Sequence, residues 1–147
     1  MRGAAARPPF HRTFPIGLDV EVCTFSALER AWKESTQTFH REHVMPYIYE
    51  GAILARVSPV LATGISPRGF IIAQLNNDDD FGGQRWTVDT AEDLAFIREV
   101  FSRLDDEETY SWRDVLSLVK NDPRLGQINA SVKHKTMIEV DERAKKK

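Results

Sequence analysis

The chain has 147 residues, the size of one ordinary domain, and its 41% hydrophobic and 29% charged residues are typical of a globular protein. Twenty Lys and Arg against 22 Asp and Glu give a net charge of −2, which argues against nucleic-acid binding through a broad basic field. Uninterrupted apolar runs such as residues 70–73 are far shorter than the roughly 20 residues of a membrane span. Cys23 is the single cysteine, which excludes an intrachain disulfide and favours a cytoplasmic location.

The two ends of the chain differ in composition from its middle. Residues 1–13 contain arginines but no acidic residue, and the chain ends in three consecutive lysines. We therefore expect residues 1–13 to be a disordered or spurious N-terminal segment and residues 136–147 to be a charged tail. The globular part is expected over residues 14–135.

The globular part begins with the pattern of a strand followed by a helix. Leu18, Val20 and Val22 alternate with polar residues, which predicts a strand with one face on a core. Ser26 with Glu29 three residues later has the spacing of a capping box, so we expect a helix to begin there.

The next part predicts one more helix and two strands. A helix is expected over residues 41–49, with an uncertain boundary at Pro46 because proline is tolerated only in the first turn. Residues 53–60 and 69–75 have strand-like composition, and residues 64–69 between them have the composition of a turn.

The C-terminal part predicts a short strand over residues 85–88 and two capped helices. Thr90 with Asp93, and Ser111 with Asp114, have capping spacing. The first helix presents an apolar face, and the second has inward-facing aliphatic residues: Leu94, Ile97, Val100, Phe101 and Leu104, then Val115, Leu118 and Val119. The mixture of strands and helices predicts an α/β layer fold.

Acidic residues occur at two places where a ligand could bind. Asp19 and Glu21 project from the same face of the first expected strand, and Asp89 lies where a strand ends and a helix begins. In open α/β sheets ligands bind at that edge, and Mg²⁺ is held there by one or two carboxylates plus phosphate oxygens. The alternative is that Asp89 and Thr90 only cap the helix.

Three segments occur in a characteristic order: FPIGLDVEV (residues 14–22), REHVMPYIY (41–49) and RWTVDTAEDL (85–94). Together with SWRDVL (111–116) and QINA (127–130), they resemble the C-terminal half of the cytidylyltransferase family that includes the spore coat polysaccharide biosynthesis proteins. Related enzymes are the acylneuraminate and 3-deoxy-manno-octulosonate cytidylyltransferases. The resemblance implies part of a nucleotide-diphospho-sugar transferase (Rossmann-like) fold, with a mixed sheet and flanking helices.

The resemblance also implies an activity, namely transfer of CMP from CTP to a sugar acid or related sugar with release of pyrophosphate. By motif match Asp89 corresponds to a Mg²⁺-binding aspartate of the family. The match implies substrate-binding positions for five residues: Asp19, Glu21, Arg41, His43 and Arg85. The implied partners are CTP and the sugar, with a second copy of the chain or a complementing N-terminal half, and neither nucleic acid nor a membrane.

The sequence also departs from the family. The Gly-rich triphosphate loop and the Gly-Asp-x-Pro stretch of the family have no counterpart in residues 1–147. We therefore expect a truncated chain that is inactive alone. The alternative is a non-catalytic remnant, a sugar-binding or dimerisation module.

Overall fold

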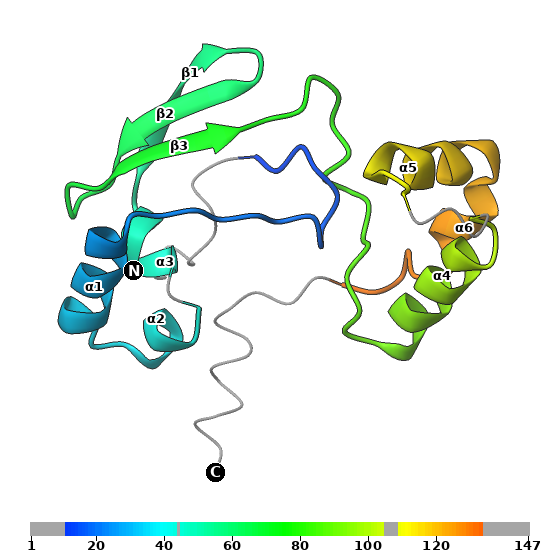
Figure 1. Ribbon diagram of the computed structural model, residues 1–147, viewed down its shortest axis with the longest axis horizontal. Helices are drawn as coiled ribbons and strands as arrows, with labels where there is room; N and C mark the ends of the chain where they lie inside the picture. Colours follow the sequence, from blue (N-terminus) through cyan, green and yellow to red (C-terminus); the bar gives the residue numbers. More distant parts are fainter. Residues whose placement is uncertain (1–10, 44, 105–108, 134–147) are drawn as a thin grey trace. The chain divides into compact units, whose positions relative to one another are not determined.

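The computed structural model describes residues 11–43, 45–104 and 109–133 (Figure 1). The chain divides into two compact units, which are described separately. The sheet unit contains residues 11–13, 20–43 and 45–80, and the helical unit contains residues 14–19, 81–104 and 109–133. Of the expected N-terminal segment 1–13, residues 1–10 lie outside the described residues, as does the whole expected tail 136–147. Residues 11–13 are ordered against the sheet unit, where the buried Thr13 accepts a hydrogen bond from Asn77 N at 2.8 Å.

The sheet unit combines helices with one antiparallel sheet of strand order β1-β2-β3, which confirms a mixed α/β fold. Its elements are α1 (Phe25–Glu34), α2 (Thr38–His43), α3 (Met45–Tyr49), β1 (Ile53–Ser58), β2 (Leu61–Ile65) and β3 (Ile71–Leu75). A tight turn joins β2 to β3, in which Gly69 adopts a φ of 81° that side chains other than glycine rarely accept.

The core of the sheet unit lies on one side of the sheet. Ala31 of α1, Tyr47 and Ile48 of α3 and Phe70 before β3 form a buried cluster, against which Ile72 packs. Figure 1 shows α1 and α3 below the sheet, on the same side. The other side of the sheet carries no helix from the described part of this unit.

The expected strand at residues 18–22 is wrong. These residues form no strand, and Val20 and Val22 are both 86% exposed. Alternating polarity predicts a strand only where a neighbouring strand pairs with it, and the described part of the chain supplies no such neighbour. Helix α1 begins one residue before Ser26, because Thr24 is the N-cap and its hydroxyl accepts from Ala27 N at 3.2 Å.

Two other boundaries differ from the expectation. The helix expected over 41–49 is divided into α2 and α3, and Pro46 lies in the first turn of α3, where its missing N–H is harmless. Strand β2 was missed, because its Gly64 is a poor strand former and belonged to the expected turn.

The helical unit contains α4 (Ala91–Phe101), α5 (Trp112–Asn121) and α6 (Pro123–Gln127). The capping box of Thr90 and Asp93 is confirmed. At α5 the backbone N–H and the hydroxyl of Ser111 donate to the Asp114 carboxylate at 2.6 and 2.8 Å, so this start was also predicted correctly.

The core of the helical unit is built around Phe96, Val100 and Leu125, which are almost fully buried. The expected face of α4 was partly wrong, because Leu94 is 38% and Phe101 53% exposed, whereas the unexpected Phe96 is buried. Around this core pack Trp86, Ile97, Leu104, Val115, Leu118, Val119 and Ile128.

The strand expected over 85–88 is reduced to one parallel bridge between Ile16 and Arg85. Trp86 N donates to Ile16 O at 2.7 Å, and Ile16 N donates to Gln84 O at 2.8 Å. Gly17 follows with a φ of 108°, and a Cβ there would lie 2.8 Å from Thr87 N. Among the described strands the sheet is antiparallel throughout, so the expected mixed sheet is not observed there.

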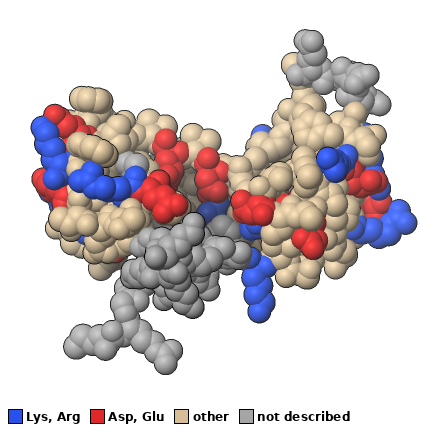
Figure 2. Space-filling view, turned by 90° about the horizontal axis from the view of Figure 1, so that it is seen from below, with Lys and Arg blue, Asp and Glu red and all other residues tan. Residues whose placement is uncertain are grey.

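None of the helices in the described ranges is long and apolar enough to cross a membrane. Acidic and basic side chains are interspersed on the face shown in Figure 2. On α1, for example, Arg30 pairs with Glu34 and Lys33 pairs with Glu29, both one helical turn apart.

Candidate functional site

A buried ion pair lies at the start of α4 in the helical unit. Arg85 Nε donates to Asp93 Oδ1 at 2.9 Å, and Arg85 Nη2 donates to Asp93 Oδ2 at 2.8 Å. Arg85 is 8% exposed and Asp93 is fully buried. The planar guanidinium and the carboxylate therefore form a bidentate ion pair that is shielded from water.

Asn129 connects this pair to the chain after α6. Its side-chain nitrogen donates to Arg85 O at 2.9 Å and to Asp93 Oδ1 at 3.0 Å. The hydrogen bonds from Arg85, and then those from Asn129 and the backbone, hold the pKa of the Asp93 carboxyl well below its usual range. The same contact with Asp93 raises the pKa of Arg85. Both groups therefore remain charged at neutral pH.

Asp89 is the exposed member of this cluster. Its Oδ2 accepts from Arg85 Nη2 at 2.7 Å, while its side chain is 61% exposed. The helix is capped without it, because Thr90 Oγ1 accepts from Asp93 N and Asp93 Oδ2 accepts from the backbone N–H groups of Asp89 and Thr90. The carboxylate of Asp89 is thus oriented by Arg85 and presented to solvent.

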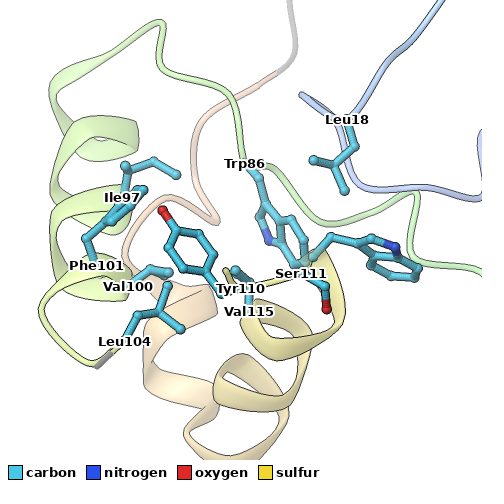
Figure 3. Close-up of a pocket in the computed structure, with 10 residues that line it drawn as sticks. Leu18, Trp86, Ile97, Val100, Phe101, Leu104, Tyr110, Ser111 and Val115 are labelled. Atoms are coloured by element: carbon cyan, nitrogen blue, oxygen red, sulfur yellow. The ribbon is translucent and has the colours of Figure 1, made fainter. Parts of the chain in front are cut away.

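An apolar hollow of about 210 Å³ lies in the same unit (Figure 3). The rings of Trp86 and Tyr110 border it, with aliphatic and aromatic side chains from α4. Phe101 and Tyr110 meet edge to face at 5.5 Å. The hollow is smaller than a typical pocket for a drug-sized ligand, so it fits a single ring or a short aliphatic group. Its lining residues are Leu18, Trp86, Ile97, Val100, Phe101, Leu104, Tyr110, Ser111, Trp112 and Val115.

Of the residues predicted to bind substrate, Arg85 forms ion pairs with two carboxylates. Its guanidinium is shared between Asp93 and Asp89, so the structure gives it a positioning role toward Asp89. The predicted contact of Arg85 with a sugar carboxylate stays a prediction.

Arg41 and His43 lie on α2 of the sheet unit. Arg41 Nη2 donates to Trp32 O and Ser35 O at 3.2 and 3.1 Å, and its guanidinium lies 4.5 Å from the Trp32 ring centre. Arg41 therefore caps the C-terminal end of α1 by binding its carbonyl oxygens. The Nε2 atom of His43 is buried and has no hydrogen-bond partner among the described residues.

Asp19 and Glu21 are exposed and lie in different units, Asp19 in the helical unit and Glu21 in the sheet unit. Asp19 Oδ2 accepts from Gly17 N at 3.3 Å. The two carboxylates do not project from one strand face as predicted, because the strand is not formed. Of the predicted site residues, the structure brings together Arg85 and Asp89.

A second polar network, in the sheet unit, was not predicted from the sequence. His40 is buried and its Nε2 is hydrogen-bonded to Glu50 at 3.2 Å, while Arg68 donates to the same carboxylate at 3.0 Å. Tyr47 OH donates to Glu34 at 2.6 Å, which lowers the pKa of Glu34 and raises that of Tyr47. This network connects α1, α2 and α3 to the β2–β3 turn.

Asp93 and Asn129 were also missed as members of the site. From the sequence, Asp93 was recognised only as a capping residue. No local pattern links Asn129 to Arg85, which lies 44 positions earlier in the chain. The only signal was the presence of both residues in segments that resemble the cytidylyltransferase family.

The described residues provide few ligands for Mg²⁺. They contain no group of three or more His, Cys, Asp or Glu side chains able to hold a metal ion. Mg²⁺ often takes only one or two carboxylates and completes its shell with water and substrate phosphates. Asp89, exposed and held in orientation, fits that mode as a single ligand.

The chain is similar to an uncharacterized protein of Methanocaldococcus jannaschii, with 32% identity over 127 residues. The match covers 86% of this chain and 46% of the archaeal protein, so the chain spans about half the length of the curated relative. The chain matches no protein family model and no solved structure.

Proposed function

We propose that this chain is the C-terminal part of a CTP-dependent cytidylyltransferase of surface or spore coat polysaccharide biosynthesis, with a nucleotide-diphospho-sugar transferase (Rossmann-like) fold. The complete enzyme would transfer CMP from CTP to a sugar acid or related sugar and release pyrophosphate. The observation that supports this proposal most directly is that Asp89 is presented to solvent by Arg85 while Thr90 and Asp93 cap α4.

The alternative role for Asp89, helix capping, is filled by other residues. The fold does not need the Asp89 carboxylate as a helix cap, yet the buried Arg85 holds it in a fixed orientation. Such a charged side chain is available to bind a ligand. Arg85 cannot turn away from Asp89 freely, because Asp93 and Asn129 hold its guanidinium and its carbonyl. Asp89 therefore points in a direction set before any ligand binds, which reduces the entropic cost of binding.

In this proposal Mg²⁺ would neutralise negative charge on the phosphate oxygens. Asp89 would be its protein ligand from this chain, and Arg85 would orient Asp89. Asp19, Glu21, Arg41 and His43 remain proposed substrate-side residues, on the strength of the family resemblance.

The length of the archaeal relative is compatible with the proposal. The triphosphate-binding loop is absent from residues 1–147, and the relative has roughly half of its length outside the matched part. We therefore expect no turnover by this chain alone.

The test is pyrophosphate release with CTP, Mg²⁺ and a panel of sugar acids. Three proteins are compared: this chain, the archaeal relative, and a chimera in which this chain replaces the matched part of the relative. We expect turnover by the last two and none by the first. Absence of turnover by a folded relative with every sugar would refute the cytidylyltransferase proposal, whereas turnover by the relative but not by a folded chimera would favour the non-catalytic alternative for this chain.

A further inference from the structure

The apolar hollow of the helical unit has no part in the proposed function. Its walls come from residues 18 and 86, from α4, and from α5 with the segment just before it (Figure 3). None of the described side chains that line it is charged. A neutral wall favours a neutral ligand, because a charge placed there would lose its water without gaining a counter-charge.

The volume of the hollow sets the size of the ligand. At about 210 Å³ it is larger than an engineered apolar cavity of about 150 Å³ that binds benzene. One six-membered ring with a short substituent therefore fits, whereas a larger molecule does not. Phe101, Tyr110 and Trp86 contribute their rings to the lining, and aromatic rings pack well against one another edge to face or offset.

The lining also offers a hydrogen-bond donor. The indole N–H of Trp86 and the hydroxyl of Tyr110 have no hydrogen-bond partner among the described residues. In Figure 3 the nitrogen of Trp86 lies on the edge of its ring that is turned toward Tyr110. A ligand that filled the hollow would separate this N–H from water, and an unpaired buried donor is costly. The favoured ligand therefore carries a hydrogen-bond acceptor beside its ring.

We propose that this hollow binds a small neutral aromatic molecule, with one ring and one hydrogen-bond acceptor such as a carbonyl or hydroxyl oxygen. The ring packs against Phe101 and Tyr110, and the acceptor takes the hydrogen bond that Trp86 Nε1 donates. For a molecule of about nine non-hydrogen atoms we expect a dissociation constant of about 0.1–1 mM. The site goes beyond the proposed function, whose ligands are CTP, Mg²⁺ and a sugar.

The first experiment is a titration of the full chain with acetophenone, a single ring with one carbonyl oxygen, followed by the indole N–H signals in nuclear magnetic resonance. The chain has three tryptophans, and Trp32, on α1 of the sheet unit, is the internal reference. The signal of Trp86 should shift and saturate, while that of Trp32 stays in place. No saturable shift up to about 10 mM, ten times the weakest expected dissociation constant, or equal shifts of both signals would overturn the proposal.

The second experiment compares three probes of nearly the same size: acetophenone, ethylbenzene without an acceptor, and the benzoate anion. Benzoate should bind at least tenfold more weakly than acetophenone, because the hollow offers its charge no partner. Trp86→Phe keeps a ring and removes the N–H. It should weaken acetophenone about three- to tenfold and change ethylbenzene less than twofold. Equal binding of benzoate and acetophenone, or equal effects of Trp86→Phe on both neutral probes, contradicts the proposed contacts.

The third experiment fills the hollow. Val115→Phe places a ring in the site that the ligand would occupy, and Val57→Phe makes the same change at a position of β1 that is 62% exposed. The first variant should bind acetophenone at least tenfold more weakly, and the second should bind it like the unmodified chain. Equal affinity in all three chains would place the binding site elsewhere.

Circular dichroism shows whether each variant is folded. If Val115→Phe does not fold, the comparison of the neutral probes in Trp86→Phe decides the question. None of these measurements depends on enzymatic turnover, so their outcome is separate from that of the proposed function.

Discussion

Arg85 and Asp93 meet side by side in the interior of the helical unit, with two nitrogens of the guanidinium on two oxygens of the carboxylate at 2.9 and 2.8 Å. The pair joins the segment before α4 to the first turn of α4, and through Asn129 to the chain after α6. A contact of this kind holds segments that are distant in sequence in one fixed arrangement. Its removal should affect both the stability of the unit and the position of Asp89.

We expect Arg85→Met to destabilise the helical unit by about 3–5 kcal/mol, because the substitution leaves the buried Asp93 carboxylate without its counter-charge. Urea unfolding followed by circular dichroism measures the loss. The matched control is Lys33→Met, which removes the exposed Lys33–Glu29 pair and should cost no more than about 0.5 kcal/mol. Equal effects of the two substitutions would show that the Arg85 pair is not buried in solution.

The stability of the chain should decrease with acid in a range set partly by Asp93. Hydrogen bonds from Arg85 hold the folded-state pKa of Asp93 well below its ordinary value of 3.8. The unfolded chain therefore binds this proton first as the pH falls. The stabilisation is complete above about pH 5 and is lost progressively below it.

Asp93→Asn should remove this part of the acid dependence. Unfolding free energies measured between about pH 7 and pH 2 should fall less steeply in the variant than in the natural chain. Some dependence of the unfolding free energy on pH should remain, because Arg124 and Arg103 also lower the pKa of Asp122. An unchanged slope below pH 4 would contradict the assigned pairing.

Gly64→Ala should disrupt the sheet. A Cβ at this position would overlap the Ile53 carbonyl oxygen, so β1 and β2 would have to separate. We expect a loss of about 1–3 kcal/mol or more, as for other overpacked sites. Gly83→Ala is the control, because nothing lies within 4 Å of a Cβ there. Thermal melting should distinguish the two, and a Gly64→Ala chain as stable as the control would refute the strand register.

Asp89→Asn should weaken binding of divalent cations with little effect on the fold. The substitution keeps the shape of the exposed side chain and removes its charge, while the caps of α4 are left intact. In the chimera with the archaeal relative, the Mg²⁺ concentration for half-maximal turnover should rise about tenfold or more, the scale of a lost charged ligand contact. Mn²⁺ titration followed by electron paramagnetic resonance should show the same weakening without turnover.

The matched control for Asp89→Asn is Glu92→Gln. Glu92 is an exposed carboxylate in the first turn of the same helix. If both substitutions change cation binding equally, the effect is one of general charge and Asp89 is not a specific ligand.

The parts of this structure that the sequence predicted are those governed by residues close together in the chain. The capping of α4 by Thr90 and Asp93 and the start of α5 at Ser111 depend on contacts three residues apart. The turn before β3 was also visible, because Gly69 supplies a backbone conformation that few residues adopt. In each case the interaction that decides the structure lies within one short segment.

The tertiary structure decided which of these segments pair and which side chains become buried. Residues 18–22 alternate like a strand, yet they form none and Val20 and Val22 are exposed, because a strand is stable only with a partner strand that the sequence pattern does not specify. Arg85 looked like a ligand for an acidic sugar, and only the folded chain shows that Asp93 and Asn129 hold it. The alignment of Ile53, Ile65 and Ile71 across the three strands likewise arises from strand register, which is a long-range property. Residue type and spacing thus determined the local elements, while burial and pairing required the whole fold, since both depend on which distant groups exclude water from each other.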